Sequence, residues 1–466
     1  MKRLIIMLAV LVGIAGNTYP ATVAPQLSDS IPKTWSYESD HISVLPSDDR
    51  WWKVFDDPAL TALIKRGEEN SLNLRLAMRR IEMARQSWLA AKAGWFPQLG
   101  LTAGWTKERT SGDMTGAGRP ANMSYFQLGL NFSWEIDVFG RVAAGVKEGK
   151  AAWQYSRAEY AAAMISLCSN IAQAYVNLLL VHAEIGVAEK QIESQQKIHA
   201  ITEARHEAGL ASKLDVEQAL TVLLSTQATL PALKASEASA LNSLALLTGC
   251  YADSIRDVTD VPRPLPNPFV MVNTGIPADL LRRRPDIIAA EYELAQYAAA
   301  LGVAKKDFLP VLTLNGSVGT SAHRIDDLFT DRSFTYSIAP QLSWTIFEGL
   351  ARNRRVAEAK EQMLAGIDNY NLAVMNAVTE ADDAVASYRF ALERIGLIAK
   401  VRDASAESFE LALDRYKRGL TAFTDVMNAQ ISVLQYQNEY LQAKAAALSA
   451  VIKLYAAVAG SPITLK

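Results

Sequence analysis

Side chains able to take part in catalysis or to bind a metal are sparse in this 466-residue chain. None of its five histidines lies at the short spacing from other ligands that metal sites use; they are His41, His182, His199, His206 and His323. His199 and His206 share one helix face, but we interpret them as exposed residues of a coiled coil rather than as metal ligands. The sequence shows no nucleophile motif and no carboxylate or metal cluster, so we expect neither an enzyme nor a cofactor.

Two aspartates stand out because they occupy equivalent places in a repeated pattern. The stretch Arg205…Gly209-Leu210…Asp215-Val216 returns after 210 residues as Arg415…Gly419-Leu420…Asp425-Val426, and Ser133-Trp134-Glu135-Ile136 returns as Ser343-Trp344-Thr345-Ile346. A repeat of this length indicates two copies of one multi-element module. Each aspartate begins a helix just past a turn, so capping of that helix explains the pair as well as a functional role does.

Each copy contains an uninterrupted stretch that predicts a very long helix. Proline is absent from residues 121–230 and 341–461. The stretches Gly140 to Gly209 and Gly349 to Gly419 would form helices of roughly 100 Å at 1.5 Å rise per residue. A turn and a second helix of roughly 36 residues follow each one, and a short helix before the strands supplies most of the remaining length. Globular domains do not use such rods, so the pattern predicts a long coiled-coil assembly.

Between the helices the hydrophobic period changes from 3.6 to 2 residues, in the segments 98–105, 126–136, 312–318 and 336–346. Strands of about ten residues with one apolar and one polar face are typical of transmembrane barrels. A half-buried strand of a soluble sandwich alternates too, but the flanking rods favour the barrel. Pro340 predicts a bulge or an edge position in the fourth segment. The residues we assign to the lipid are Leu128, Leu130, Phe132, Trp134, Leu342 and Trp344.

The N-terminus and the composition indicate export. Met1-Lys2-Arg3 and the apolar run Leu4 to Gly16 have the form of a secretory signal peptide. No later segment is an unbroken run of 18 apolar residues, which argues against a helical inner-membrane transporter. A net charge of −2 argues against a nucleic-acid partner. Cys168 and Cys250 allow one bridge in an oxidising periplasm, but we expect two separate buried thiols.

Several motifs together identify a family. The chain resembles TolC-like outer-membrane efflux channels, in the NodT branch that serves tripartite resistance-nodulation-division pumps, over nearly everything after Trp51. The motifs that carry the resemblance are Trp51-Trp52-Lys53-Val54-Phe55-Asp56-Asp57-Pro58, Asn73-Leu74-Arg75, Asp137-Val138-Phe139-Gly140-Arg141, Pro277-Ala278-Asp279-Leu280-Leu281-Arg282-Arg283-Arg284-Pro285-Asp286-Ile287 and Arg415-Tyr416…Gly419.

The resemblance implies an α+β membrane protein built as a tandem duplication. Three protomers would form a twelve-stranded β-barrel in the outer membrane of a Gram-negative bacterium and a long α-helical periplasmic tunnel. The homotrimer would be the passive exit duct of a tripartite pump, with a periplasmic adaptor and an inner-membrane resistance-nodulation-division transporter as partners and outer-membrane lipid around the barrel. The expected segments are a signal peptide (1–16), an N-terminal extended segment (17–50), a first repeat (51–261), a Pro-rich linker (262–276), a second repeat (277–460) and a tail (461–466).

The resemblance also places a gate at the periplasmic mouth. Tyr416 and Asp425 match the family's constricting positions, and Asp215 is the equivalent of Asp425 in the first copy. Thr421 and Asn428 stand where some relatives carry an Arg and a further Asp, which favours hydrogen bonds and packing over a salt-bridged latch. Asn17 follows Ile14-Ala15-Gly16 where many relatives carry a lipidated Cys.

Two alternatives remain open from sequence. A soluble periplasmic coiled-coil scaffold would explain the rods and the signal peptide, but it would leave the alternating strands without an apolar partner. A secreted helical enzyme would lack any recognisable catalytic group.

Overall fold

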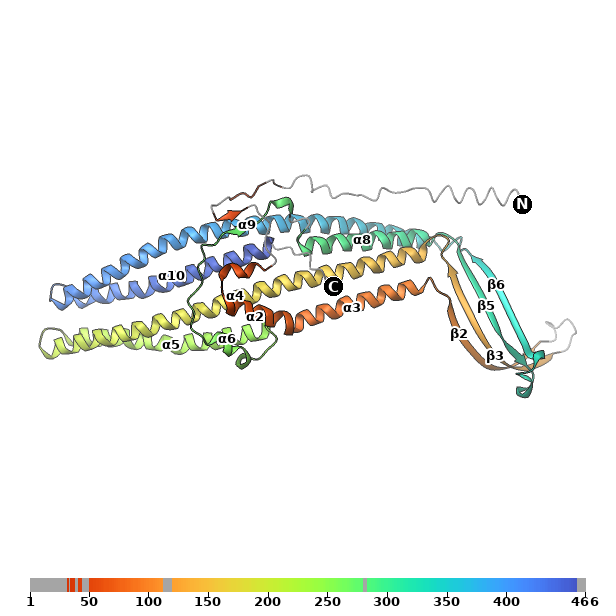
Figure 1. Ribbon diagram of the computed structural model, residues 1–466, viewed down its shortest axis with the longest axis horizontal. Helices are drawn as coiled ribbons and strands as arrows, with labels where there is room; N and C mark the ends of the chain where they lie inside the picture. The colour runs from red at the N-terminus through yellow and green to blue at the C-terminus, as the bar shows by residue number, and fades with distance from the viewer. Residues whose placement is uncertain are drawn as a thin grey trace.

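The computed structural model describes residues 32, 34–37, 41–43, 50–111, 120–279 and 283–458. The expected signal peptide 1–16, Asn17 and the tail 461–466 lie outside these residues. The molecule is elongated, with a β-sheet at one end and, at the other, two turns that each connect a long helix to a shorter one (Figure 1).

Two helices of 67 residues, α4 (Arg141–Glu207) and α9 (Ala351–Lys417), run along the molecule. At 1.5 Å rise per residue each is about 100 Å long, which is the length expected from the sequence. The helices α3 (Leu72–Ala93) and α5 (Lys213–Leu247) pack end to end along α4, while α8 (Pro285–Lys306) and α10 (Phe423–Val458) pack along α9 (Figure 1). Helix α8 also contacts α4.

The turns at the far end close the long helices in the same way in both copies. After α4, the Leu210 amide donates to the Arg205 carbonyl and the Gly209 amide to the His206 carbonyl, both at 2.8 Å. This bond pattern needs a residue with positive φ, and Gly209 (φ 71°) and Gly419 (φ 77°) supply it. The two α-hairpins are therefore built alike.

The sheet contains four antiparallel strands in the order β2-β3-β5-β6, so β2 and β6 are its edges. Three strands are longer than the ten residues expected; the four are β2 (Gln98–Thr110), β3 (Ala121–Ile136), β5 (Val311–Ala322) and β6 (Phe334–Ser343). Pro340 lies on the edge strand β6, as predicted. The prediction that the fourth strand includes Trp344 and Ile346 was wrong, because β6 ends at Ser343.

The strand register gathers the apolar residues of all four strands on one face. Leu130 lies opposite Leu101 on β2 and opposite Val318 on β5, and Val318 lies opposite Tyr336 on β6. Residues directly opposite each other share a face of the sheet. The alternation read from the sequence thus becomes one continuous apolar surface.

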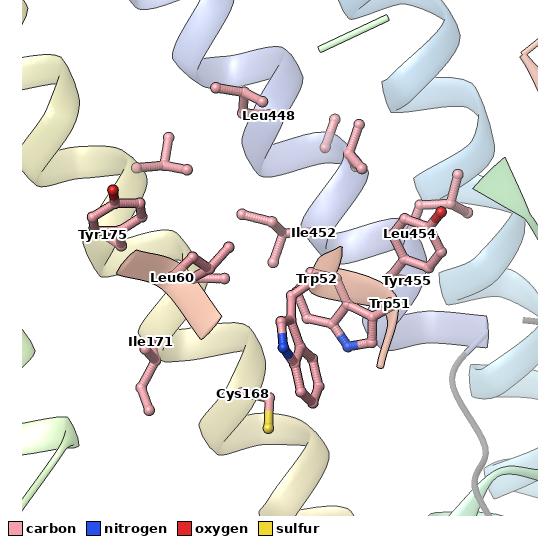
Figure 2. Packing of buried hydrophobic residues seen from close by; sticks show 14 of the residues in the cluster. Trp51, Trp52, Leu60, Cys168, Ile171, Tyr175, Leu448, Ile452, Leu454 and Tyr455 are labelled. Atoms are coloured by element: carbon pink, nitrogen blue, oxygen red, sulfur yellow. The ribbon is translucent and has the colours of Figure 1, made fainter. Parts of the chain in front are cut away.

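The largest core lies at the middle of the molecule. The indole of Trp51, in the short helix η2 (Trp51–Phe55), stacks on the ring of Tyr455 on α10 with centroids 5.4 Å apart (Figure 2). Asp57 caps α2 (Pro58–Asn70) by accepting the Ala59 amide, and it also accepts the Tyr175 hydroxyl at 2.8 Å. The remaining short elements are β1 (Ile42–Ser43), η3 (Ala252–Ile255), α6 (Arg256–Thr259), β4 (Val272–Asn273), η4 (Pro277–Asp279), η5 (Ile325–Asp327) and η6 (Asp331–Ser333).

Helices α4 and α10 each contain an 18-residue window with the length and composition of a membrane span. The sequence contains no unbroken run of 18 apolar residues after the signal peptide. The expectation that no later segment resembles a membrane span was nevertheless wrong for these two windows. More than half of each window is buried. Packing against neighbouring helices therefore accounts for the apolar composition.

Candidate pore constriction at the helix tips

Asp215 caps the start of α5 reciprocally with Ser212. The Asp215 amide donates to the Ser212 hydroxyl at 3.2 Å, and its carboxylate accepts the Ser212 amide at 3.1 Å. This capping box satisfies two amides that have no partner within the helix. Asp215 is half-buried. Its two hydrogen bonds with Ser212 show that the capping role considered from the sequence is present at this residue.

Asp425 lies at the same place in the second hairpin, but with different partners. Ala422 stands where Ser212 stands in the first copy and has no hydroxyl to offer. The Thr421 hydroxyl donates instead to the Asp425 carboxylate. Asp425 and Asn428 are both exposed at the start of α10. Thr421, selected from the sequence as a possible neighbour of the gate, is thus in direct contact with Asp425.

The turns that follow α4 and α9 form the tip of the molecule, opposite the sheet (Figure 1). Tyr416 is buried there, with 4% of its surface exposed. Its ring packs edge-on against Phe423, with centroids 5.4 Å apart, and the Arg205 guanidinium lies over it at 4.8 Å. Burial raises the pKa of Tyr416, while the neighbouring side chains of Thr202 and Arg205 partly offset the rise. Around it lies a small apolar cluster of Ile198, Ala219, Phe409, Tyr416, Phe423, Val426 and Val433.

The tip therefore brings Tyr416, Thr421, Asp215 and Asp425 to one end of the molecule, but Tyr416 faces its own protomer. Sequence reasoning missed Arg205 and Phe423, whose contacts join distant segments. It also missed Ser212, although the spacing from Ser212 to Asp215 is a readable capping signal.

The residues assigned to lipid lie on the apolar face of the sheet or at its end. Leu130, Leu342 and Trp344 are exposed, whereas Leu128, Phe132 and Trp134 are half-buried. The Phe132 ring covers Gly316 so closely that a Cβ there would lie 2.0 Å from it.

Two tryptophans, related by the duplication, join the sheet to the helices. The indole nitrogens of Trp134 and Trp344 donate to the carbonyls of Trp95 and Phe308, both at 3.0 Å. The opposite face of the sheet is polar, and there Asn131 donates to the Thr102 hydroxyl at 2.9 Å.

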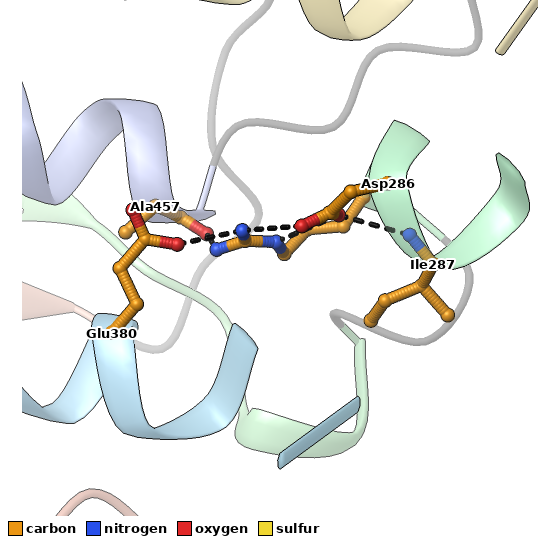
Figure 3. Close-up of polar contacts among 5 residues, drawn as sticks. Asp286, Ile287, Glu380 and Ala457 are labelled. Atoms are coloured by element: carbon orange, nitrogen blue, oxygen red, sulfur yellow. Dashed lines mark hydrogen bonds and ion pairs between the residues drawn. The ribbon is translucent and has the colours of Figure 1, made fainter. Parts of the chain in front are cut away.

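Arg284 joins three helices at the middle of the molecule. It bonds Asp286 at the start of α8, Glu380 of α9 at 2.6 Å and the Ala457 carbonyl of α10 at 2.8 Å (Figure 3). Burial alone would lower the pKa of Arg284, but the bond to Asp286 and the charge of Glu380 raise it. This explains why an Arg-Pro-Asp sequence begins α8.

No group of three or more His, Cys, Asp or Glu side chains that could hold a metal occurs among the described residues. Cys168 and Cys250 are free thiols, the first buried and the second half-buried.

Comparison with known proteins assigns the family. The sequence model described as "Outer membrane efflux protein" matches residues 63–250 and 276–460. The chain is 28% identical to the solvent efflux pump outer membrane protein SrpC of Pseudomonas putida over 88% of this chain and 86% of SrpC. It is 27% identical to nodulation protein T of Rhizobium leguminosarum bv. trifolii over 82% and 81% of the two chains.

The fold is similar to that of a solved channel. The outer-membrane channel OprN superposes with a TM-score of 0.88 at 27% identity, covering 95% of this chain and 98% of OprN. The soluble scaffold is therefore not favoured, and the family is one of transport channels rather than a known class of enzyme. The chain belongs to the outer membrane efflux protein family and is an outer-membrane channel of the NodT type.

Proposed function

We propose that three copies of this chain close one channel, with twelve strands in the outer membrane and twelve helical rods around a periplasmic tunnel. The sheet carries this proposal, because one of its faces is apolar and both of its edges, β2 and β6, are unpaired in the protomer. Unpaired backbone groups are costly in a bilayer, so each edge must meet the edge of another sheet. Four strands are too few to close alone, since single-chain outer-membrane barrels begin at about eight.

In this assembly the apolar face meets lipid and the polar face lines the lumen. Leu342 is 65% exposed and Leu130 51% exposed in the protomer, as lipid contact requires. Trp134 and Trp344 lie at the helix end of the sheet, where a membrane interface would favour their amphipathic rings.

The assembled channel would act as the passive exit duct of an efflux pump. SrpC is named as the outer-membrane protein of a solvent efflux pump, which supports an inner-membrane pump and a periplasmic adaptor as partners here. Energy would come from that pump. The two repeats would span residues 51–261 and 277–460, joined by the linker 262–276, in keeping with the equal lengths of α4 and α9.

The helix tips would form the gate. Three copies would bring six carboxylates, Asp215 and Asp425 of each, around the periplasmic mouth, and rings of carboxylates attract cations and resist anions. Packing around Tyr416 would hold the tips closed, while the local bond of Thr421 to Asp425 would order the turn, with Asn428 beside it. An adaptor that spreads the tips would open the duct.

Recordings from the purified protein in planar bilayers test this function. We expect infrequent openings that favour K⁺ over Cl⁻, read from the reversal potential across a salt gradient. A permanently open, unselective pore would contradict the gate, and the absence of conductance from membrane-inserted protein would contradict the duct.

A further inference from the structure

The two α-hairpins of a protomer, α4–α5 and α9–α10, touch near their tips through a few side chains. We infer that Arg205 is the residue that fastens one hairpin to the other and so sets how readily the channel opens. This inference rests on the proposed tip gate and assigns that gate a positioning residue.

A hydrogen bond forms the first part of the fastening. Arg205 lies in the last turn of α4, and its Nη1 donates at 2.8 Å to the carbonyl of Lys417, the last residue of α9. The final carbonyls of a helix lack partners within it and carry the negative end of its dipole. A cation from one hairpin thus caps the long helix of the other, across 212 residues of sequence.

Ring contacts form the second part. The Arg205 guanidinium lies over one side of the Tyr416 ring, and Phe423 packs against that ring edge-on. A guanidinium over an aromatic face is attracted by the ring quadrupole, more strongly where water is excluded. Arg205 therefore holds the buried position of Tyr416 as well as the end of α9.

The Tyr416 hydroxyl contributes little to this contact. It is covered and makes no hydrogen bond of good geometry among the described residues, although Thr202 and Arg205 lie nearby. The nearby Thr202 hydroxyl donates to the Ile198 carbonyl at 2.9 Å instead. Tyr416 thus contributes mainly its ring to the closed tip.

Among the residues that the structure describes, the second copy has no equivalent of the Arg205 contact. Arg415 occupies the place of Arg205 in the second copy, but its side chain is exposed and makes no side-chain hydrogen bond, ion pair or ring contact within the described part of the chain. His206, in the place of Tyr416, is exposed too. The duplication thus supplies a matched control for Arg205.

Two buried glutamines near the tips, one in each hairpin, have an amide atom without a partner in the described part of the chain. Gln195 of α4 and Gln430 of α10 are 2% and 3% exposed, and each has a buried amide atom without a partner among the described residues. Buried unpaired polar atoms are costly, and separation of the hairpins would let water reach them. The contacts of Arg205 thus add to the apolar cluster in which Ile198 and Ala219 of one hairpin pack with Phe409, Phe423 and Val426 of the other.

The test measures the basal open probability of trimers in planar bilayers without an adaptor. Arg205→Ala should raise it about tenfold or more, through loss of a charge-assisted bond and the ring contact. Arg415→Ala should leave it at the parent value. Arg205→Lys should give an intermediate value, because Lys keeps the charge but not the planar fork. Tyr416→Phe should match the parent, whereas Tyr416→Ala should also raise the open probability, because it removes the ring contact but leaves the bond to Lys417.

A double variant separates a shared contact from general weakening of the tip. Arg205→Ala combined with Tyr416→Ala should raise the open probability by less than the two single effects combined, because the ring contact is lost in both variants. Additive effects, a parent-like Arg205→Ala, or an equal rise in Arg415→Ala would overturn the inference. If Arg205→Ala fails to assemble, Arg205→Lys decides the matter. If the aspartate variants change selectivity while the Arg205 variants behave like the parent, the proposed gate is retained and the proposed role of Arg205 is refuted.

Discussion

The hydroxyl of Tyr388 lies 2.6 Å from the carbonyl oxygen of Val270, so the middle of α9 is bonded to the Pro-rich linker between the two copies. The same hydroxyl accepts the Val270 amide at 3.2 Å. Tyr388 is fully buried, and burial raises the pKa of its hydroxyl to about 12, so it remains a donor across the physiological range. One side chain thus orders the connection between the two copies.

Tyr388→Phe should therefore destabilise the protein by about 1 to 3 kcal/mol, because it leaves linker groups without a partner. The measurement is the midpoint of denaturant unfolding in detergent. Tyr370→Phe is the control, since the half-buried Tyr370 on the same helix makes no hydrogen bond of this kind among the described residues. Equal midpoints for the two variants would show that the linker is held elsewhere.

The two faces of the sheet predict opposite responses to charge. Leu128→Arg should reduce membrane insertion, at a cost of roughly 2 to 4 kcal/mol near the midplane, whereas Asn131→Arg on the polar face should be tolerated. The yields of folded protein in outer-membrane fractions provide the comparison. Similar yields would mean that the faces are wrongly assigned.

The two thiols should differ in reactivity. Burial raises the pKa of Cys168 to about 12, so the thiol stays protonated and covered near pH 8, whereas Cys250 is only half-buried. Brief alkylation of the native protein, read by mass spectrometry, should modify Cys250 first, and both cysteines should react after unfolding. Failure of both to react after unfolding without a reductant would instead indicate a bridge.

Replacement of the tip aspartates tests their role in selectivity. Asp215→Asn combined with Asp425→Asn should lower the preference for K⁺ over Cl⁻, because six carboxylates leave the proposed mouth. Reversal potentials in a salt gradient measure the change. The Asp414→Asn variant removes a carboxylate that pairs with Arg418 on the side of α9, and it should keep the parent selectivity. An unchanged double variant would place the selective ring elsewhere.

The long helices and the two-faced strands were predictable because their signals are local. Proline-free stretches bounded by glycines mark α4 and α9, and strict alternation marks the strands, so neither requires knowledge of distant contacts. The end of β6 was misjudged because Trp344 continues the alternation, although its indole bonds the Phe308 carbonyl just beyond α8 and the chain has already left the sheet.

The surroundings of the candidate gate were less predictable. Residues Asp215, Asp425 and Tyr416 were found through the duplication and the family resemblance. The contact of Arg205 with Tyr416 was not, because it joins side chains more than 200 residues apart whose packing no local pattern reveals. The exchange of Ser212 for Ala422 was readable in the sequence, yet its consequence, the bond from Thr421 to Asp425, appears only in the folded hairpin.

Native mass measurement of the detergent-extracted protein tests the proposed channel most directly. The free edges of β2 and β6 require partners in the membrane, so the predicted species is three mature chains that remain together without an adaptor or a pump. A stable, membrane-inserted monomer would contradict the shared barrel.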